Sequence, residues 1–285
     1  MEKAIQIPYD AWFERKCQYA AAAGFRSIAV NYAPIPEKNE YSCDTQAAWD
    51  QITENIQRIL EENKLRCIQS HLPYYDLLES SEIPDERIDF ALRQAIRSGG
   101  KIGVKYGVFH LRSSISTAYR PSKSFEDNRK ILERLLEDAV PCDTAIAVEN
   151  IPIFPDNSKL MPFYSANFED LSTLVDSFRD DHVVICWDFG HANLMKWDQA
   201  AAIEFLGSRI KCTHIHNNFG FYDDHATPDS GNIPWERVMP ALAATGFDGP
   251  LTLETHCYYS DPELLKSFAK HNYVCLEFLE RMMKK

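Results

Sequence analysis

The sequence lacks the long apolar runs of a membrane protein. No stretch approaches the roughly 18 consecutive apolar residues that span a bilayer. The N-terminal segment MEKAIQIPYD also lacks the basic and then apolar layout of a signal peptide. We therefore expect a cytoplasmic protein with no membrane partner.

Paired cysteines are also missing. The 8 cysteines are scattered without a CxxC pair, which argues against a zinc ribbon and a disulfide framework. Cys67, Cys186 and Cys212 fall within apolar, strand-like runs, where a free cysteine behaves as a small hydrophobic residue.

Positive charge is in deficit, since the formal net charge is -12. Such a balance argues against a broad nucleic-acid surface, although a barrel can still carry a local basic patch. The chain also has no GxGxxG element, low-complexity segment or linker. A nucleic-acid partner is not expected, and a homo-oligomer is compatible with the sequence.

What the sequence does contain is a regular alternation of short β-branched runs and longer amphipathic stretches. At 285 residues with 45% hydrophobic content, eight such pairs predict one α/β domain over residues 1–285, a (β/α)8 barrel rather than an open doubly wound sheet. The predicted strands are Ala4–Ile7, Ser27–Tyr32, Cys67–Leu72, Tyr106–Leu111, Ala145–Ile151, Val183–Asp188, Ile210–His216 and Leu251–Thr255.

Several helix ends are also predicted. Asp10 should cap the first helix and Gly24 should close it, while Asp261 and Pro262 should begin the last. The other amphipathic stretches are Thr45–Asn63, Glu126–Asp138, Leu171–Phe178, Asp198–Leu206 and Trp235–Ala244. The two longest irregular stretches, Ser113–Ser124 and Ile151–Asn167, both follow strands and should lie over the active face of the barrel.

Ionisable side chains end four of the strands on the inward face. Because strand side chains alternate, Glu149 shares a face with Ala145 and Ala147, and the same parity applies to Asp188, His216 and Glu254 in their strands. Such groups in a shared, poorly solvated mouth would repel or go unpaired without a cation. Three carboxylates and an imidazole suit Mn²⁺, Zn²⁺, Co²⁺ or Mg²⁺. The alternative is a set of ordinary salt bridges.

Further polar residues follow the same strand ends. His71, His110, His191, Asp223 and His225 are candidates for additional metal or substrate contacts, against the alternative of hydrogen-bonded core or rim residues. We expect His214, one layer below His216, to orient the ligands rather than bind the metal itself.

Aromatic and basic residues complete the predicted mouth. Candidates for stacking on a sugar ring, or for ordinary packing, are Trp187, Phe189, Phe219, Phe221, Tyr222, Tyr74 and Tyr75. Arg112 and Lys196 are candidates for holding a phosphate or carboxylate, or for surface ion pairs.

Three segments carry a family resemblance. WDFGHAN (Trp187–Asn193), HIHNN continuing through DDH to GNIPW (His214–Trp235) and LTLETH (Leu251–His256) resemble the xylose-isomerase-like barrel superfamily. Within it they look most like the sugar (phosphate) isomerase/epimerase branch, which includes D-tagatose 3-epimerase and hydroxypyruvate isomerase. Endonuclease IV is a more distant relative.

The resemblance implies specific roles. One divalent ion would be held by Glu149, Asp188, His216 and Glu254, and the two glutamates would move the proton of a small ketose, polyol-ketone or related hydroxy-carbonyl substrate through an enediolate. His191 would contact the substrate. Arg112 and Trp187 are further candidate binding residues from their own chemistry and not from the resemblance. The family's arginine shortly after the metal histidine has no counterpart, since no Arg lies between Arg209 and Arg237.

Two alternatives remain at this point. His71, His110, Glu149, Asp188, His191, His216, Asp223, His225 and Glu254 resemble in order the nine ligands of the three-zinc cluster of endonuclease IV, a phosphodiesterase. The barrel could instead be a non-catalytic binding module or subunit. The number of bound ions separates the three: about one for an isomerase, up to three for an endonuclease and none for a degenerate binder.

Overall fold

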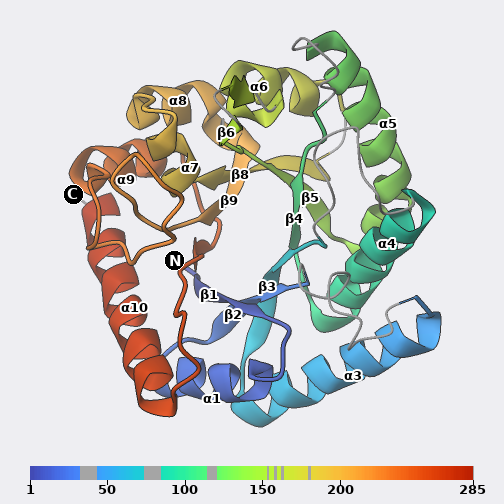
Figure 1. Ribbon diagram of the computed structural model, residues 1–285, viewed down its shortest axis with the longest axis vertical. Coiled ribbons are helices and arrows are strands. Elements are labelled where there is room, and N and C mark those ends of the chain that lie inside the picture. The colour runs from blue at the N-terminus through green and yellow to red at the C-terminus, as the bar shows by residue number, and fades with distance from the viewer. Residues whose placement is uncertain are drawn as a thin grey trace.

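A computed structural model describes residues 1–32, 44–73, 85–113, 121–152, 154–156, 159–161, 164–178 and 181–284. A ring of helices surrounds an inner set of strands (Figure 1). The described residues confirm the predicted (β/α)8 barrel.

Eight parallel strands form the barrel wall in the order β10-β1-β2-β3-β4-β5-β8-β9. The ring closes where Ile215 donates its N–H to the carbonyl of Thr252 at 2.8 Å and Glu254 donates to the carbonyl of Ile215 at 3.0 Å. The strands are β1 (Lys3–Pro8), β2 (Ser27–Asn31), β3 (Arg66–His71), β4 (Tyr106–His110), β5 (Ala145–Glu149), β8 (Val183–Asp188), β9 (Ile210–His214) and β10 (Leu251–Leu253).

The helices follow the strands around the outside. They are α1 (Phe13–Ala23), α3 (Gln46–Asn63), α4 (Asp85–Ile102), α5 (Pro121–Ala139), α6 (Phe168–Asp176), α7 (Phe189–Leu194), α8 (Gln199–Leu206), α9 (Trp235–Ala244) and α10 (Pro262–Met283). Short 3₁₀ turns lie at Val140–Cys142, Tyr164–Ala166 and Gly207–Arg209. None of the described helices is long and apolar enough to cross a bilayer.

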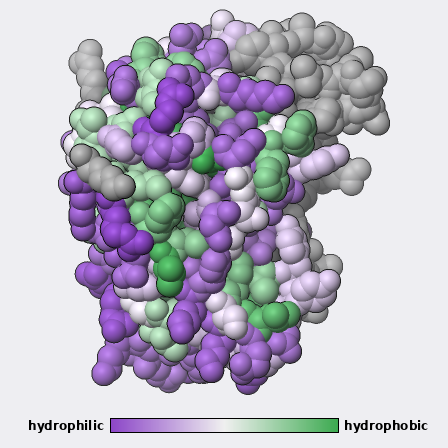
Figure 2. Space-filling view, turned by 90° about the vertical axis from the view of Figure 1, so that its left-hand side faces the viewer, coloured by the Kyte–Doolittle hydropathy of each residue, from purple (hydrophilic) through white to green (hydrophobic). Residues whose placement is uncertain are grey.

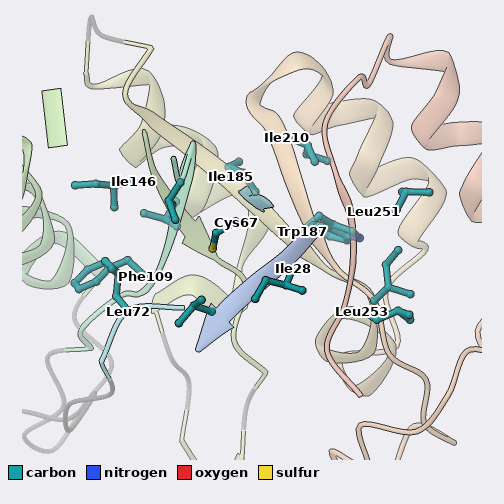
Figure 3. Packing of buried hydrophobic residues seen from close by; sticks show 14 of the residues in the cluster. Ile28, Cys67, Leu72, Phe109, Ile146, Ile185, Trp187, Ile210, Leu251 and Leu253 are labelled. Atoms are coloured by element: carbon teal, nitrogen blue, oxygen red, sulfur yellow. The ribbon is translucent and has the colours of Figure 1, made fainter. Parts of the chain in front are cut away.

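Two apolar layers confirm the predicted strand parity. The barrel interior is filled by small side chains, including Ala145, Ala147, Cys186 and Cys212. The outer layer, between strands and helices, contains the alternate residues of the barrel strands, such as Ile146, Ile185, Leu251 and Leu253 (Figure 3). Val148 belongs to the same layer. Ionisable residues that share the face of the small residues therefore point toward the barrel axis.

Local signals set most helix ends. Asp261 Oδ1 accepts the N–H groups of Glu263 and Leu264 at 3.0 Å each, as predicted for the start of α10. Gly24 ends α1 with a left-handed φ of 116°, which a residue with a Cβ rarely adopts. The prediction for Asp10 is wrong, because α1 begins at Phe13 and Asp10 instead accepts the N–H of Trp12 in the preceding turn, at 2.8 Å.

The segment after β5 also differs from its prediction. Ile151–Asn167 was expected to be irregular, but it contains a short antiparallel hairpin of β6 (Phe154–Asp156) and β7 (Lys159–Met161). Such a hairpin pairs only three residues of each strand and has little periodicity to detect.

The outer face of α8, α9 and α10 is largely hydrophilic, with hydrophobic residues scattered between (Figure 2). On α10, the apolar side chains of Leu264, Val274 and Phe278 are exposed, whereas Leu265, Leu276 and Leu279 are buried. The helix is therefore amphipathic and packs one side against the barrel.

Candidate metal centre

Four ionisable side chains meet where four neighbouring strands end. Glu149, Asp188 and His214 are the last residues of β5, β8 and β9, and Glu254 follows β10 directly. Glu149, Asp188 and His214 are fully buried and Glu254 is nearly so. We call these four residues the central group.

Their donor atoms converge within 4.8 Å of one another. His214 Nδ1 lies 3.0 Å from Glu149 Oε1, 3.0 Å from Glu254 Oε2 and 4.0 Å from Asp188 Oδ2. This set of carboxylate oxygens and one imidazole nitrogen matches the donors that Mn²⁺, Zn²⁺ or Co²⁺ prefers.

The histidine of the central group is not the one that the sequence indicated. His214, expected to be an orienting residue, approaches all three carboxylates. His216 approaches only Asp188 among them, with Nε2 at 3.1 Å from Oδ1. Both histidines point inward, so strand parity cannot separate them, and the difference lies in their depth along the barrel axis.

A second group adjoins the central one through Glu149. His110 Nε2 lies 3.0 Å from Glu149 Oε2, and His71 Nε2 lies 3.6 Å from the same oxygen. The Nε2 atoms of the two histidines are 3.1 Å apart. Glu149 thus directs Oε1 at the central group and Oε2 at His71 and His110, the arrangement of a carboxylate shared between two cation positions.

A third group lies on the side of the loop that follows β9. It consists of His191, His216, Asp223 and His225. Asp223 Oδ2 lies 3.3 Å from His191 Nε2 and 3.2 Å from His225 Nε2, while its Oδ1 lies 3.7 Å from His216 Nε2. The additional polar residues predicted from the sequence thus fall into two groups that flank the central one.

The chain around Asp188 holds these groups in place. Asp188 Oδ1 accepts the N–H of His191 at 2.6 Å and so begins α7 as its N-cap. Asn150 Oδ1 accepts the backbone N–H of Asp188 at 2.7 Å, and Asn150 Nδ2 donates to the Asp188 carbonyl at 2.9 Å. The tight turn after β8 therefore brings a carboxylate and a histidine three residues apart to one place.

Several buried polar atoms at the mouth make no hydrogen bond among the residues that the structure describes. Within the described part of the chain, Asp188 Oδ2, His214 Nε2, Asp223 Oδ1 and both ring nitrogens of His216 make no hydrogen bond, although His216 Nε2 lies 3.1 Å from Asp188 Oδ1. Buried polar atoms are normally satisfied, and a cluster of exceptions is typical of a site for an ion or ordered water. The residues present fit a divalent metal ion.

The electrostatics of the mouth point the same way. Burial alone would raise the pKa of Glu149, but the charge of His214 and the hydrogen bond from His110 outweigh it and hold the pKa well below its usual range. Burial would likewise lower the pKa of His214, yet Glu254 and Glu149 raise it well above its ordinary value. The carboxylates stay ionised and need positive charge beside them, which protonated imidazoles or a metal ion in their place can supply.

Other predicted binding residues lie elsewhere. Trp187 is fully buried in the outer layer, where it stacks on Trp197 with centroids 6.0 Å apart, so its ring does not face the mouth (Figure 3). Phe189 is buried against Trp235. Arg112 follows β4 and is anchored by its backbone, since its N–H donates to Asn128 Oδ1 at 2.7 Å.

The exposed aromatic residues belong to the loop after β9. Phe219, Phe221 and Tyr222 are 56%, 75% and 77% exposed, and the ammonium of Lys196 lies 5.8 Å from the ring centroid of Phe221. Tyr74 and Tyr75 lie outside the described residues.

Sequence reasoning missed Gln6. Its Nε2 donates to Glu254 Oε1 at 2.6 Å from the buried interior of β1. The signal was present, because Gln6 shares the inward face of its strand with Ala4, and a buried amide on that face needs a polar partner.

The chain belongs to the family described as xylose isomerase-like TIM barrel, whose model matches residues 17–271. Among curated proteins, it is 28% identical to the uncharacterized protein y4fM of Sinorhizobium fredii over 58% of this chain and 51% of that protein. It is 27% identical to a probable endonuclease 4 of Metamycoplasma arthritidis over 67% of this chain and 71% of that protein. The chain thus spans about half the length of y4fM.

Solved structures share the fold. A D-tagatose 3-epimerase-like protein superposes with a TM-score of 0.70 at 20% identity, with 99% of each chain covered. D-psicose 3-epimerase of Clostridium cellulolyticum H10 superposes with a TM-score of 0.73 at 15% identity, again with 99% of each chain covered. At these identities the likeness concerns the barrel itself.

Proposed function

We propose that the protein is a divalent-metal-dependent isomerase or epimerase of a small ketose, polyol-ketone or related hydroxy-carbonyl compound. The observation that carries the proposal is the central group, in which two buried glutamates from well-separated strands meet beside one imidazole. Similarity in fold to sugar epimerases supports the same assignment.

Glu149, Asp188, His214 and Glu254 would hold the ion, and His216 is the alternative histidine because it lies next to Asp188. A divalent ion bound there would polarise the substrate carbonyl and stabilise the negative charge that develops on its oxygen.

The proton transfer itself falls to the two glutamates. Glu149 and Glu254 extend from β5 and β10, which β8 and β9 separate around the ring. A substrate carbon between them would lose its proton to one carboxylate and regain a proton from the other, on the opposite face. Burial alone would raise the pKa of each glutamate, but the charge of His214 outweighs it and holds both pKa values well below the usual range, so each side chain favours the form that can accept a proton.

Substrate contacts would come from the rim. His191 lies 3.4 Å from Glu149 and 3.3 Å from Asp223, at the edge of the central group. Arg112 and the exposed aromatic side chains of the loop after β9 are further proposed contacts, for a polar end and for the C–H face of the substrate. Trp187 is left out because of its place in the outer layer.

Isotope exchange tests the proposal directly. The protein loaded with Mn²⁺ or Co²⁺ and incubated with a panel of ketoses in deuterated water should place deuterium on the carbon next to the carbonyl. Glu254→Gln should reduce this exchange by about 10²-fold or more, because the amide cannot accept a proton, whereas the exposed surface variant Glu204→Gln should exchange at the wild-type rate. Near-normal exchange in Glu254→Gln defeats the mechanism.

A metal-dependent phosphodiesterase is the second candidate, and the shared position of Glu149 favours it. The three ligand groups together contain all nine residues that resemble the ligands of endonuclease IV, with His214 in addition. Three ions so placed would stabilise an attacking hydroxide and a leaving oxygen. Against this candidate, the segments 33–43, 74–84 and 114–120, which follow β2, β3 and β4 in the chain, carry five acidic residues but only one lysine and one arginine.

Ion counting and a nuclease assay separate the candidates. Three ions at the mouth together with cleavage of an abasic DNA duplex would establish the phosphodiesterase. One ion with carbon-bound deuterium would establish the isomerase, and neither metal nor turnover would leave a non-catalytic barrel.

A further inference from the structure

A separate trio of metal-ligating side chains lies outside the barrel mouth. Asp229 belongs to the loop between β9 and α9, and His271 and Cys275 lie four residues apart on α10. Positions i and i+4 of a helix lie on one face, so both α10 side chains point at the same part of the loop. We call these three residues the outer triad.

The distances within the outer triad are those of a tetrahedral site. Asp229 Oδ1 lies 3.0 Å from His271 Nε2 and 3.5 Å from Cys275 Sγ, and Sγ lies 3.6 Å from Nε2. Bonds of about 2.0–2.3 Å from Zn²⁺ to oxygen, nitrogen and sulfur, at tetrahedral angles, place the donor atoms about 3.3–3.6 Å apart. The three atoms need to move by only a few tenths of an ångström to share an ion.

The three residues differ in burial and in the type of ligand atom that they offer. Cys275 is 5% exposed, while the side chains of His271 and Asp229 are 48% and 54% exposed. An ion held by the buried sulfur would therefore have its fourth position open to water. A thiolate, an imidazole and a carboxylate together select Zn²⁺ or a similar transition metal over Mg²⁺ or Ca²⁺.

A catalytic thiol is the other interpretation of a cysteine beside a histidine and an aspartate. Burial raises the pKa of the Cys275 thiol to about 12, so without a cation the sulfur remains a neutral thiol and a poor nucleophile. Metal binding would release this proton to solvent as the sulfur–metal bond forms.

We propose that Asp229, His271 and Cys275 bind a divalent transition-metal ion such as Zn²⁺ and thereby fasten the β9–α9 loop to α10. This loop carries Asp223 and His225 of the third ligand group. On the other side, α10 supplies Asn272, whose Oδ1 accepts a hydrogen bond from Thr255 next to Glu254, at 2.9 Å. An ion at the outer triad would thus stabilise two parts of the barrel mouth: the β9–α9 loop and the segment that contains Glu254.

Cobalt spectroscopy distinguishes this site from the mouth. In the part of the chain that the structure describes, no cysteine belongs to the three mouth groups. The full chain, reduced and stripped of metal, should therefore develop a near-ultraviolet sulfur-to-cobalt charge-transfer band when titrated with Co²⁺, and this band should come from the outer triad alone.

Cys275→Ser should abolish this band and remove one bound ion per chain, whereas Cys142→Ser, which alters a cysteine in the 3₁₀ turn before β5, should keep both. His271→Gln changes a half-exposed side chain and should weaken Co²⁺ binding at the band by tenfold or more, which provides the test if Cys275→Ser does not fold. Glu149→Gln should leave the band intact. Absence of the band in the wild type, or its survival in Cys275→Ser, would overturn the proposal and leave a hydrogen-bonded trio.

Discussion

Gly190 is a glycine because the ring of His216 occupies the space of a side chain. A Cβ built at this position would lie 1.9 Å from His216 Cε1 and 2.3 Å from Nδ1. The absence of a side chain in the first turn of α7 lets the imidazole lie against the backbone and face Asp188 and Asp223.

Gly190→Ala should therefore displace His216 and disturb the third ligand group. Overpacking of this kind typically costs about 1–3 kcal/mol of stability, and we expect at least one mouth ion to bind more weakly. Gly99→Ala is the control, since the nearest atom to its Cβ would be Cβ of Val104 at 3.3 Å. Calorimetric metal titration of both variants measures the difference, and equal affinities would contradict the role given to His216.

Gln6→Leu should weaken the central group without changing its ligands. The variant removes the amide that holds Glu254 Oε1 at 2.6 Å, and loss of such a supporting hydrogen bond typically costs about 10- to 100-fold in metal affinity or activity. Gln57→Leu, which removes an exposed amide bond to the Lys101 carbonyl, should leave metal affinity unchanged. An affinity for Mn²⁺ in Gln6→Leu equal to that of the wild type would show that Gln6 does not position Glu254.

Strand parity predicted which residues of the mouth point inward, but not how they group. Glu149, Asp188 and Glu254 each end a strand on the face of small residues and were predicted to converge, as the structure places them. His214 and His216 satisfy the same parity, and only the depth of β9 relative to β8 separates them. Trp187 was predicted to bind substrate although it alternates with Cys186 and Asp188; the same parity rule, applied to it, places its ring toward the helices, where the structure has it.

At the scale of elements, the end of α10 is tied to β1 by ion pairs. Glu280 Oε2 lies 2.8 Å from Lys3 Nζ, and Lys284 Nζ lies 3.3 Å from Glu280 Oε1. The hydrogen bond from Lys3 contributes most to lowering the pKa of Glu280 from 4.5 to about 2. The contact with Lys3 joins α10, which carries two of the three residues of the outer triad, to the first strand of the ring.

Because its folded-state pKa is depressed, Glu280 stabilises the fold above about pH 4.5, and this contribution is lost as the pH falls toward 2. Its partners lie near solvent, so Glu280→Gln should cost less than about 1 kcal/mol at neutral pH. The difference in unfolding free energy between wild type and variant should shrink as the pH falls below 4.5. Glu277→Gln on the same helix serves as the control, and a difference that stays constant with pH would contradict the ion-pair account.

Strands and long helices were predictable because their periodicity extends over many residues. The ends of helices were less predictable, because each depends on one or two capping residues. Five of the eight strands begin and end within one residue of their predicted ends, and β5, β9 and β10 each stop two residues early. Asp10 has the chemistry of an N-cap, yet it closes a turn before α1, because the helix starts only where Phe13 becomes buried. The hairpin of β6 and β7 is too short to produce a pattern.

At the scale of the whole molecule, metal should be part of the stability of the fold. An ion that binds only the folded chain stabilises it by about 2.7 kcal/mol at 100 times its dissociation constant. Chelation should lower the Tm of the Cys275→Ser variant, in which only the mouth can bind metal, and Mn²⁺ or Zn²⁺ should restore it. The same treatment should change the Tm little in a variant that also carries Glu149→Gln and Glu254→Gln. If chelation left the Tm of the Cys275→Ser variant unchanged, this result would contradict a bound ion at the mouth.

The ring closure explains why the groups can meet at all. β9 pairs with β10 through Ile215, so residues from β5 and from the chain after β10 come to face one point, although 104 positions separate Glu149 from Glu254. Each additional group uses a neighbouring strand end of the same ring.

Anomalous scattering from crystals soaked with Mn²⁺ tests the central claim most directly. We predict a peak at about 2.0–2.3 Å from a donor atom of each of Glu149, Asp188, His214 and Glu254. Density for these four side chains with no metal peak between them, at a Mn²⁺ concentration well above that of the protein, would contradict the account.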